Sequence, residues 1–231
     1  MIIVPCDQRS AEWNQARCGI PTASAFDRIL TPTGERSKQA IAYRNELLAE
    51  WVVGHPEIGF NSDWMERGAV LEQQARDYYE VLTDHTIAQV GFVYKDERKL
   101  CGCSPDGLFR NPLYPARATR EFDRGLEIKV LKPGNHIEHM LGEAALPLKY
   151  KPQVQGGMYV TDASEWEWLS YHPEMPPVLV TVPRDEKYIA KLHDAIESFL
   201  EDLLRQRELL TLRGIGTKAQ LEASLVLLAS K

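Results

Sequence analysis

The spacing of apolar residues predicts helices in the first third of the chain and strands in its middle. Apolar positions three and four residues apart are typical of amphipathic helices. They predict helices that begin at Ser10 and Thr22, and further helices over residues 37–53 and 63–82. Short runs rich in β-branched and aromatic residues follow, and such runs are typical of strands. We expect these strands over residues 87–94, 100–108 and 126–131.

The second half of the chain repeats this alternation with longer helices. A helix led by proline is predicted over residues 147–160, and two strands over 166–171 and 178–182. A long helix is expected over 184–212. Helices, a strand cluster, a helix, strands and a last helix fit an α/β fold with a central mixed β-sheet flanked by helices.

The length of 231 residues suits one large domain. No Gly/Ser-rich or Pro-rich linker divides the sequence, so we predict a single domain over residues 1–231. Gly214-Ile215-Gly216 interrupts the helical pattern near its end. An amphipathic tail over about 213–231 is either an assembly element or packs on its own domain.

Charged residues occur at two points on the otherwise apolar predicted strands. The first is Ser104-Pro105-Asp106-Gly107 and the second is Glu127-Ile128-Lys129. The two-residue period of a strand directs Glu127 and Lys129 to one face and Ile128 to the other. Charges on an apolar strand need a partner or a metal, and hard oxygen ligands suit Mg²⁺ or Mn²⁺. Two carboxylates beside a lysine are the groups that metal-assisted hydrolysis of a phosphodiester requires.

Local sequence alone also allows simpler interpretations of these residues. Ser-Pro-Asp-Gly is a good β-turn sequence, in which Asp106 caps the turn. Glu127 and Lys129 fit the solvent-facing side of an edge strand equally well.

Several motifs, taken in order, resemble a known family. Pro105-Asp106 with Glu127-x-Lys129 resembles the PD-(D/E)xK nuclease signature. Further motifs are W-x3-R-x-G-x2-T-A-S over residues 13–24, Gly68-x3-Glu72, Gln153-Val154-Gln155 and R-D-E-K-Y over 184–188. In this order they resemble lambda exonuclease and the YqaJ-like phage recombination nucleases, over residues 13 to about 204.

The resemblance implies a restriction-endonuclease-like core and roles for particular residues. Asp106 would be a ligand shared by two metal ions. Glu127 and the backbone carbonyl of Ile128 would be further ligands, and Lys129 would contact the attacking water. A matching glutamate, Glu72, would hold metal-bound waters, although a solvated glutamate on a polar helix face explains it equally well.

A second set of residues would form an anion pocket by the same resemblance. Arg17 would bind a terminal 5′-phosphate through charge-assisted hydrogen bonds. Ser24, Ser104 and Gln153 would complete this pocket. Each of the four alone is explained by surface charge or helix capping.

The resemblance implies an Mg²⁺-dependent 5′→3′ exonuclease on double-stranded DNA ends, with two metal ions and Mn²⁺ as a substitute. It would release 5′-mononucleotides and leave a 3′ single-stranded tail. A ring-shaped homotrimer and a single-strand annealing protein as partner are implied too. The alternatives are an endonuclease or junction resolvase on the same core, and a non-catalytic DNA-end-binding protein.

Charge and cysteine content refine this picture. The net charge of −6 argues against a protein that coats nucleic acid non-specifically, but it allows a cation-lined channel. Two basic groups either are solvated or follow the DNA backbone; they are Arg110, Arg117, Arg120 and Arg124, and Arg36, Lys38 and Arg44. We expect the four cysteines to be free thiols. With neither a signal peptide nor a membrane-spanning run expected, we predict a protein of the bacterial or phage-infected cytoplasm.

Tryptophans and histidines carry no predicted chemistry. Trp64, Trp166 and Trp168 are expected in the core or at an interface. His136 and His139 have a metal-ligand spacing on a helix, but the spacing is interpreted as coincidental because no third ligand accompanies them.

Overall fold

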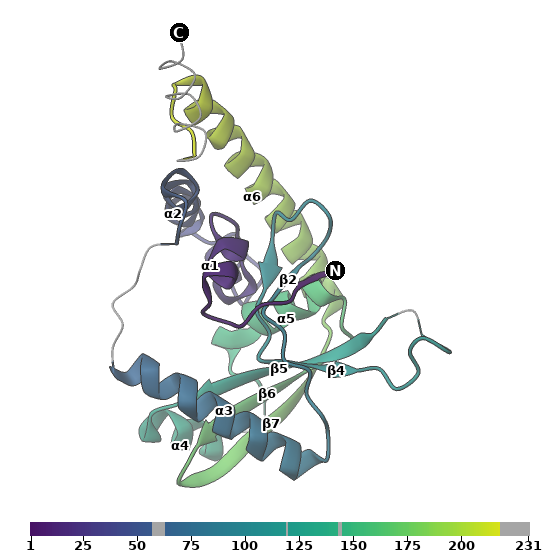
Figure 1. Ribbon diagram of the computed structural model, residues 1–231. Helices are drawn as coiled ribbons and strands as arrows, with labels where there is room; N and C mark the ends of the chain where they lie inside the picture. Colours follow the sequence, from purple (N-terminus) through teal and green to yellow (C-terminus); the bar gives the residue numbers. More distant parts are fainter. Residues whose placement is uncertain (57–62, 119, 143–144, 218–231) are drawn as a thin grey trace.

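The computed structural model in Figure 1 describes the chain except for residues 57–62, 119, 143–144 and 218–231. Helices and strands alternate along it much as the sequence predicts. In chain order they are β1 (Ile2–Val4), α1 (Ala11–Arg17), the 3-10 helix η1 (Ala23–Arg28), α2 (Ala40–Val53), α3 (Asp63–Thr83), β2 (Phe92–Tyr94), β3 (Gly102–Cys103), β4 (Gly107–Arg110), β5 (Phe122–Val130), α4 (Pro133–Leu141), the 3-10 helix η2 (Leu148–Tyr150), α5 (Lys151–Thr161), β6 (Glu165–His172), β7 (Met175–Pro183) and α6 (Glu186–Leu212).

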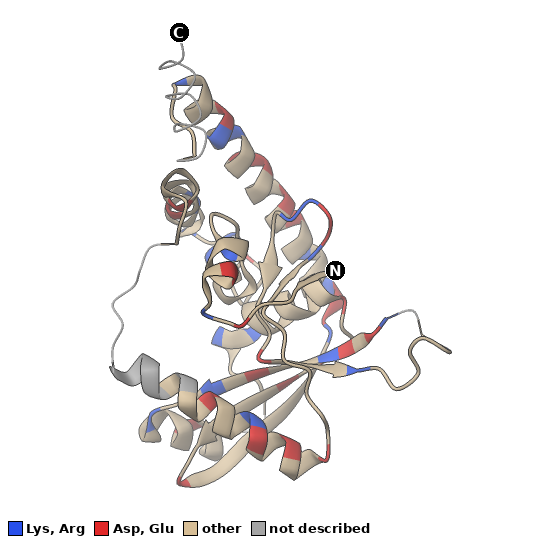
Figure 2. Ribbon diagram, viewed as in Figure 1, with Lys and Arg blue, Asp and Glu red and all other residues tan. Residues whose placement is uncertain are grey.

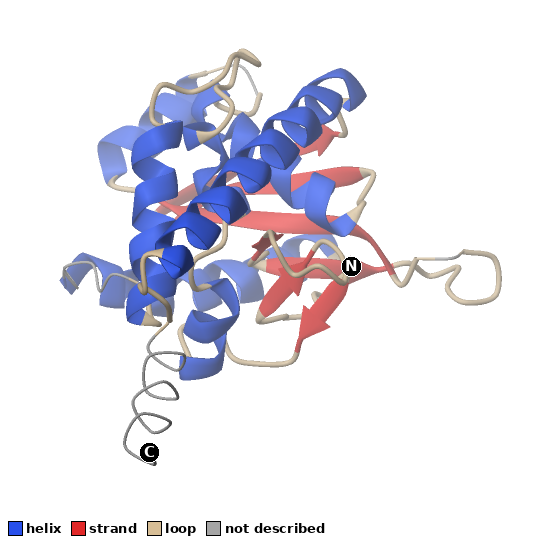
Figure 3. Ribbon diagram, turned by 90° about the horizontal axis from the view of Figure 1, so that it is seen from above, coloured by secondary structure: helices blue, strands red, loops and turns tan. Residues whose placement is uncertain are grey.

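The described strands form two sheets. The smaller has the order β1-β2-β3 and is antiparallel throughout. The larger has the order β4-β5-β6-β7, in which only β5 and β6 run parallel. Helices surround the strands in the view of Figure 3. The predicted α/β fold with a mixed sheet flanked by helices is therefore confirmed.

The larger sheet is covered on both faces. Alternate residues of β6 point to opposite sides, as the period of a strand requires. Trp166 and Trp168 lie in the larger apolar core, which includes buried residues of α5 and α6. Leu169 and Tyr171 pack in a second cluster, with Ala75 and Tyr79 of α3. Helix α3 therefore covers one face of the sheet and α5 the other (Figure 1).

Two glycines let the chain approach the buried Trp166 ring. A Cβ at Gly125 of β5 would lie 2.4 Å from ring carbons of Trp166, and one at Gly157 of α5 would lie 2.8 Å away. Trp166 is buried to 1% exposure, so its ring has little room to move aside. These positions thus set how closely β5, β6 and α5 pack.

We predict that Gly125→Ala lowers the free energy of unfolding by about 1–3 kcal/mol, because it overpacks the core against Trp166. Gly134→Ala is the matched control, since a Cβ there has no atom of the described structure within 4 Å. In α4, that change is neutral or slightly stabilising. Urea denaturation midpoints measure both effects, and equal midpoints for the two variants would contradict the packing argument.

Three strands have bounds that differ from the predicted ones. The run over 100–108 divides into β3 and β4, separated by Ser104 to Asp106. Pro105 lacks the N–H that a ladder requires, which explains the interruption. Strand β5 begins at Phe122 because it pairs with β4 in a hairpin extension, and the sequence placed its start four residues later. In the run over 87–94, only Phe92–Tyr94 forms a strand.

The helices also depart from the sequence predictions. The proline-led segment starts as η2 before α5 begins at Lys151, and the bounds of α4 were not predicted. Val70 and Val81 are apolar positions of α3, yet they are 62% and 87% exposed. Only one side of α3 contacts the sheet, because the helix lies on the sheet's outer surface.

The remaining sequence predictions concern cysteines, tryptophans and the tail. All four cysteines are free, with Cys101 and Cys103 buried. Trp166 and Trp168 are in the core as expected, whereas the side chain of Trp64 lies outside the described part. The predicted tail lies outside it from residue 218 onward, and the single domain over 1–231 stays a prediction. None of the helices described here combines the length and apolarity that crossing a membrane requires.

Candidate active site

Asp106 is held where β4 begins, against the middle of β5. Its backbone N–H donates to the carbonyl of Leu126 at 3.1 Å. Its Oδ2 accepts a 2.6 Å hydrogen bond from the N–H of Ile128. These two bonds bring the carboxylate beside the strand that carries Glu127 and Lys129, so the turn interpretation does not describe its full environment.

Glu127 and Lys129 point to the same side of β5, as the strand period predicted. Lys129 Nζ lies 2.6 Å from Glu127 Oε1. Gln153 of α5 joins them: its Nε2 donates to Glu127 Oε1 at 2.6 Å, and its Oε1 accepts from Lys129 Nζ at 3.0 Å. Residues 127–130 of β5 pair with β6 alone, because the pairing with β4 ends at Leu126. Glu127 is nevertheless only 6% exposed, so the interpretation of a solvent-facing glutamate is wrong.

Burial dominates the electrostatics of the two acids. It raises the pKa of Asp106 well above its ordinary value, and the neighbouring charges of Glu127 and Glu72 raise it further. Burial also raises the pKa of Glu127, although Lys129 opposes that shift. For Lys129, burial lowers the pKa, but the Glu127 and Asp106 carboxylates outweigh it and the net shift is upward. Two buried carboxylates and one ammonium leave an excess of negative charge that a cation would stabilise.

Glu72 is placed beside Asp106 by two arginines. Arg76, one helical turn further along α3, lies 3.1 Å from Glu72 Oε1, and its Nε donates to the carbonyl of Asp106 at 2.9 Å. Arg9 lies 3.2 Å from Glu72 Oε2. Neither Arg9 nor Arg76 belongs to a motif that predicts this contact. The i,i+4 spacing of Glu72 and Arg76 is the one signal that indicates their pairing.

The donor set fits a hydrated divalent cation. Within the described residues, three His, Cys, Asp or Glu side chains do not gather around a single point as metal ligands. The donors that the structure brings together are the carboxylates of Asp106 and Glu127; the backbone carbonyl of Ile128 stays a ligand predicted from the resemblance. Mg²⁺ usually keeps several waters and takes only one or two carboxylates from a protein. Hard oxygen donors with a net negative charge are thus compatible with Mg²⁺ or Mn²⁺.

The four residues predicted to bind a phosphate line one cavity of about 190 Å³. They are Arg17, Ser24, Ser104 and Gln153. Glu127 lines the same cavity, so the cavity reaches the acidic site. The structure therefore brings both predicted sets of residues into one continuous region.

Trp13 positions two of these residues. Its indole Nε1 donates to Ser104 Oγ at 2.8 Å, and the Arg17 guanidinium lies 4.1 Å from its ring centroid. Burial lowers the pKa of Arg17, because removal of the cation from water is unfavourable. An anion in the cavity would stabilise this desolvated guanidinium. In the sequence Trp13 is one residue of a motif, and nothing local predicts this bridging position.

Comparison with known proteins identifies the family. The model of the YqaJ-like viral recombinase domain matches residues 12–164. The chain belongs to the YqaJ-like viral recombinase family. This confirms the resemblance found in the sequence, and the matched region contains all predicted site residues, whose individual roles remain predictions. No curated protein matches the chain significantly.

Solved structures agree with membership of the YqaJ-like family. The alkaline exonuclease LHK-Exo from Laribacter hongkongensis is 26% identical, with a TM-score of 0.74 over 89% of this chain and 98% of that one. LHK-Exo in complex with dAMP gives the same identity and coverage with a TM-score of 0.75. A phage related exonuclease from Haemophilus somnus 129PT, 14% identical, shares the fold with a TM-score of 0.55 over 81% of this chain and 96% of that one.

In this member of the YqaJ-like family, much of the predicted basic surface is occupied by internal contacts. Figure 2 shows Lys and Arg positions interspersed with Asp and Glu along the ribbon. Arg110 pairs with Glu121, Arg124 lies 3.6 Å from Glu165, and Arg44 lies 2.5 Å from Asp202. The remaining arginines with such contacts are Arg36, which donates to carbonyls of α6, and Arg120, which pairs with Asp162. These contacts favour a structural role for these side chains over a role in following DNA.

The two histidines of α4 have different surroundings. Both ring nitrogens of His136 are engaged, at 2.7 Å from Ser170 Oγ and 2.9 Å from the carbonyl of Pro176. His139 packs edge-on against Trp168.

Proposed function

We propose that this protein is an Mg²⁺-dependent 5′→3′ exonuclease that acts on double-stranded DNA ends, releases 5′-mononucleotides and leaves a 3′ single-stranded tail. Its family and its likeness to the alkaline exonuclease LHK-Exo make it a DNA nuclease, a hydrolase. One observation carries the finer proposal. A single cavity is lined both by Arg17, Ser24 and Ser104 and by Glu127 of the acidic site.

The pocket would bind the end of the substrate strand. Arg17 contributes the charge, and the hydroxyls of Ser24 and Ser104 contribute neutral hydrogen bonds to a terminal phosphate. Trp13 keeps Arg17 and Ser104 in place through the two contacts described above. Because the same cavity reaches Glu127, a strand held by its terminal phosphate presents its first phosphodiester to the acidic site.

The acidic site would carry out the hydrolysis. Asp106, Glu127 and the carbonyl of Ile128 would hold Mg²⁺ (two ions, with Mn²⁺ as a substitute), which when bound activates water and stabilises charge on the phosphate. Lys129 is fixed by Glu127 and Gln153. Its raised pKa keeps it protonated at neutral pH, so it orients the attacking water by donating a hydrogen bond to it. Glu72, held beside Asp106 by Arg76, would accept hydrogen bonds from waters at the site.

The assembly and partner are proposed on the family resemblance. Three copies would form a ring that duplex enters, and a single-strand annealing protein would take over the 3′ tail, in the cytoplasm of a bacterial or phage-infected cell. Exposed apolar residues on α3, among them Val70 and Val81, support an interface on that helix. Light scattering should give the mass of a trimer, and a monomer would remove the ring from the proposal.

The central experiment is digestion of linear duplex with and without a 5′-phosphate, with the products separated by size. We expect mononucleotides from the 5′-phosphorylated strand with Mg²⁺, and none with EDTA. The 5′-hydroxyl strand should be degraded more slowly. Release of nucleotides from the 3′ end first would overturn the proposed polarity.

The alternatives predict different results. An endonuclease or junction resolvase would nick closed circular duplex, whereas the proposed exonuclease needs an end and leaves circles intact. A non-catalytic end-binding protein would retain linear duplex without degrading it in Mg²⁺. The cavity that joins a cationic pocket to the acidic site favours the exonuclease, because an endonuclease does not need to recognise a terminal phosphate.

We predict that Arg17→Ala reduces the preference for 5′-phosphorylated over 5′-hydroxyl duplex by about 10- to 100-fold, the value of a charge-assisted hydrogen bond. Initial rates on the two substrates at low concentration measure this ratio. Arg44→Ala is the control, because Arg44 is on α2 and pairs with Asp202 of α6. An unchanged ratio in Arg17→Ala would remove Arg17 from the proposed phosphate pocket.

A further inference from the structure

Gln153 connects the two halves of the site, and we infer that it couples occupancy of the phosphate pocket to the placement of Lys129. It lines the cavity together with Arg17 and Ser104, and it also contacts both Glu127 and Lys129. The resemblance to the family suggested only that it binds phosphate. This inference rests on the proposed function and adds a positioning role that links recognition of the strand end to the rate of hydrolysis.

The contacts form a closed triangle. Lys129 Nζ donates to Glu127 Oε1 at 2.6 Å and to Gln153 Oε1 at 3.0 Å. Gln153 Nε2 donates to the same Glu127 oxygen at 2.6 Å. Lys129 is thus held from two sides, once by a carboxylate and once by an amide carbonyl. Without the Gln153 amide, the Lys129 ammonium would keep only its contact with Glu127. The position of the ammonium would then be less well defined.

The orientation of the amide is fixed by charge. Its carbonyl end faces the Lys129 ammonium and its NH2 end faces the Glu127 carboxylate. The reversed amide would place oxygen against carboxylate and N–H against ammonium, and both contacts would be repulsive. The observed orientation is therefore the one that directs an acceptor at Lys129.

A phosphate in the cavity would favour the same orientation. A primary amide has two N–H donors, and the contact with Glu127 uses one of them. Since Gln153 lines the cavity, the second N–H can donate to an anion there. That bond would fix the NH2 end more firmly and, through the rigid amide plane, the carbonyl end that holds Lys129. Two sites that favour one orientation of a shared group are thermodynamically coupled.

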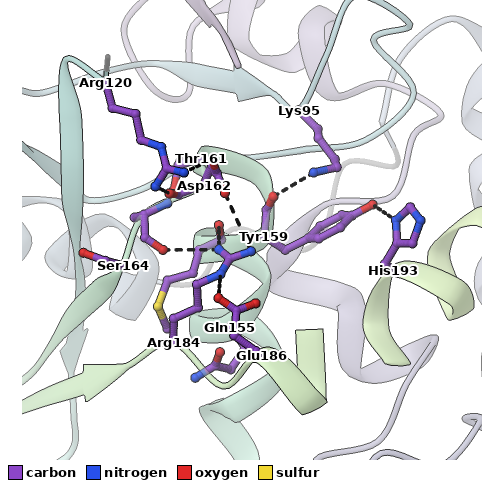
Figure 4. Close-up of polar contacts among 12 residues, drawn as sticks. Lys95, Arg120, Gln155, Tyr159, Thr161, Asp162, Ser164, Arg184, Glu186 and His193 are labelled. Carbon is purple, nitrogen blue, oxygen red and sulfur yellow. Dashed lines mark hydrogen bonds and ion pairs between the residues drawn. The ribbon is translucent and has the colours of Figure 1, made fainter. Parts of the chain in front are cut away.

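The helix that carries Gln153 is well anchored, so the coupling acts through the side chain. Every residue of α5 from Val154 to Thr161 is buried. Gln155, two residues further along the same helix, has a structural role, because both ends of its amide bind backbone groups. Its Nε2 donates to the carbonyl of Pro183 at 3.0 Å, and its Oε1 accepts from the N–H of Asp185 at 2.9 Å. Figure 4 shows Gln155 among the polar contacts around the end of α5.

The test compares kcat on saturating 5′-phosphorylated and 5′-hydroxyl duplex. The wild-type protein should have the higher kcat on the phosphorylated end. Gln153→Ala should lower that kcat by about 10- to 100-fold, the effect expected for loss of a residue that positions a catalytic group. The kcat on the hydroxyl end should change less, so the ratio should approach one. Gln153→Glu keeps the side-chain length and an acceptor for Lys129, but it places a negative charge beside Glu127 and the phosphate. In this variant too, the ratio of kcat on the phosphorylated end to kcat on the hydroxyl end should approach one.

Gln155→Ala is the matched control. It removes an amide from the same helix, so we expect it to lower the unfolding midpoint while the kcat ratio stays as in the wild type. A merely structural Gln153 would behave in the same way. A double-mutant cycle adds a second measure: Arg17→Ala and Gln153→Ala should be non-additive in the kcat ratio if they act on one coupled site.

The outcomes separate the inference from the proposed function. If the wild-type protein degrades duplex from the 5′ end with a phosphate-dependent kcat, and Gln153→Ala and Gln153→Glu both keep that dependence, the coupling is overturned while the exonuclease stands. If the wild-type protein shows neither 5′ polarity nor a phosphate effect, the proposed function itself has failed. The coupling is supported if the kcat ratio between phosphorylated and hydroxyl duplex falls to about one in both Gln153 variants and keeps its wild-type value in Gln155→Ala.

Discussion

Replacing Asp106 by Asn is expected to abolish DNA cleavage and, without metal, to make the folded protein more stable. Loss of a carboxylate from the proposed Mg²⁺ site removes several kcal/mol of transition-state stabilisation, which corresponds to a rate loss of about 1,000-fold or more. The gain in stability has a separate cause. Burial, Glu127 and Glu72 all disfavour the charged form of Asp106 in the folded state.

The sign of the pH dependence follows from that shift. The pKa of Asp106 is raised on folding, so between its ordinary value near 4 and the raised value the folded state binds more protons than the unfolded state. This group's contribution to stability therefore falls as the pH rises through that window, and stays unfavourable above it. The Asn side chain does not titrate, so Asp106→Asn lacks this contribution. In EDTA, the gain in stability of Asp106→Asn over wild type should therefore be larger at pH 8 than at pH 5.

Thermal unfolding with and without Mg²⁺ completes this test. Mg²⁺ at about 100 times its dissociation constant should stabilise the wild-type protein by about 2.7 kcal/mol, and Asp106→Asn by much less. Asp194→Asn is the control, because Asp194 is exposed on α6, and it should change neither activity nor the Mg²⁺ effect. Full activity in Asp106→Asn, or an unchanged response to Mg²⁺, would rule out Asp106 as a ligand.

Replacing Lys129 by Met is expected to abolish cleavage too, but to change stability in the opposite direction. Met has a similar length and cannot donate a hydrogen bond to water. It also leaves Glu127, which is 6% exposed, without its ammonium partner. Removal of one member of a buried pair costs up to about 3–5 kcal/mol. We therefore expect a lower denaturation midpoint in EDTA, where Asp106→Asn raises it.

Binding should separate the catalytic defect from a loss of recognition. Fluorescence anisotropy with a 5′-phosphorylated duplex in Mg²⁺ should show that Lys129→Met still binds the strand end, because Arg17, Ser24 and Ser104 are unchanged. Lys187→Met, at an exposed position near the start of α6, is the control for the loss of a positive charge. Cleavage by Lys129→Met at the wild-type rate would contradict a role for the ammonium in hydrolysis.

The sequence predicted the centre of the site well because its chemistry is local. Asp106 follows a proline that interrupts the strand, and Glu127 and Lys129 are charges with strand spacing inside an apolar run. These local patterns left a turn and a solvent-facing edge strand open as alternatives, and the resemblance to a nuclease family favoured one shared site. The position of β5 between β4 and β6 was not visible, because strand order depends on long-range pairing rather than on local pattern.

The supporting residues were harder to predict for the same reason. Arg9 and Arg76 meet at Glu72 from segments 67 positions apart, and neither belongs to a motif that identifies it. The bond from Trp13 to Ser104 spans 91 positions. The double contact of Gln153 depends on the register between α5 and β5. Such contacts arise from tertiary packing, for which a single sequence has no periodic signal.

The place of Trp13 in the cavity gives the protein an intrinsic optical probe. Its indole contacts both the guanidinium of Arg17 and the hydroxyl of Ser104, so an anion that binds these groups alters the polarity around the ring. Tryptophan emission should therefore respond to occupancy of the cavity. Comparison of wild type with Trp13→Phe separates this signal from that of the other four tryptophans, of which Trp166 also lines the cavity. The signal would follow capture of a strand end in real time without any label on the DNA.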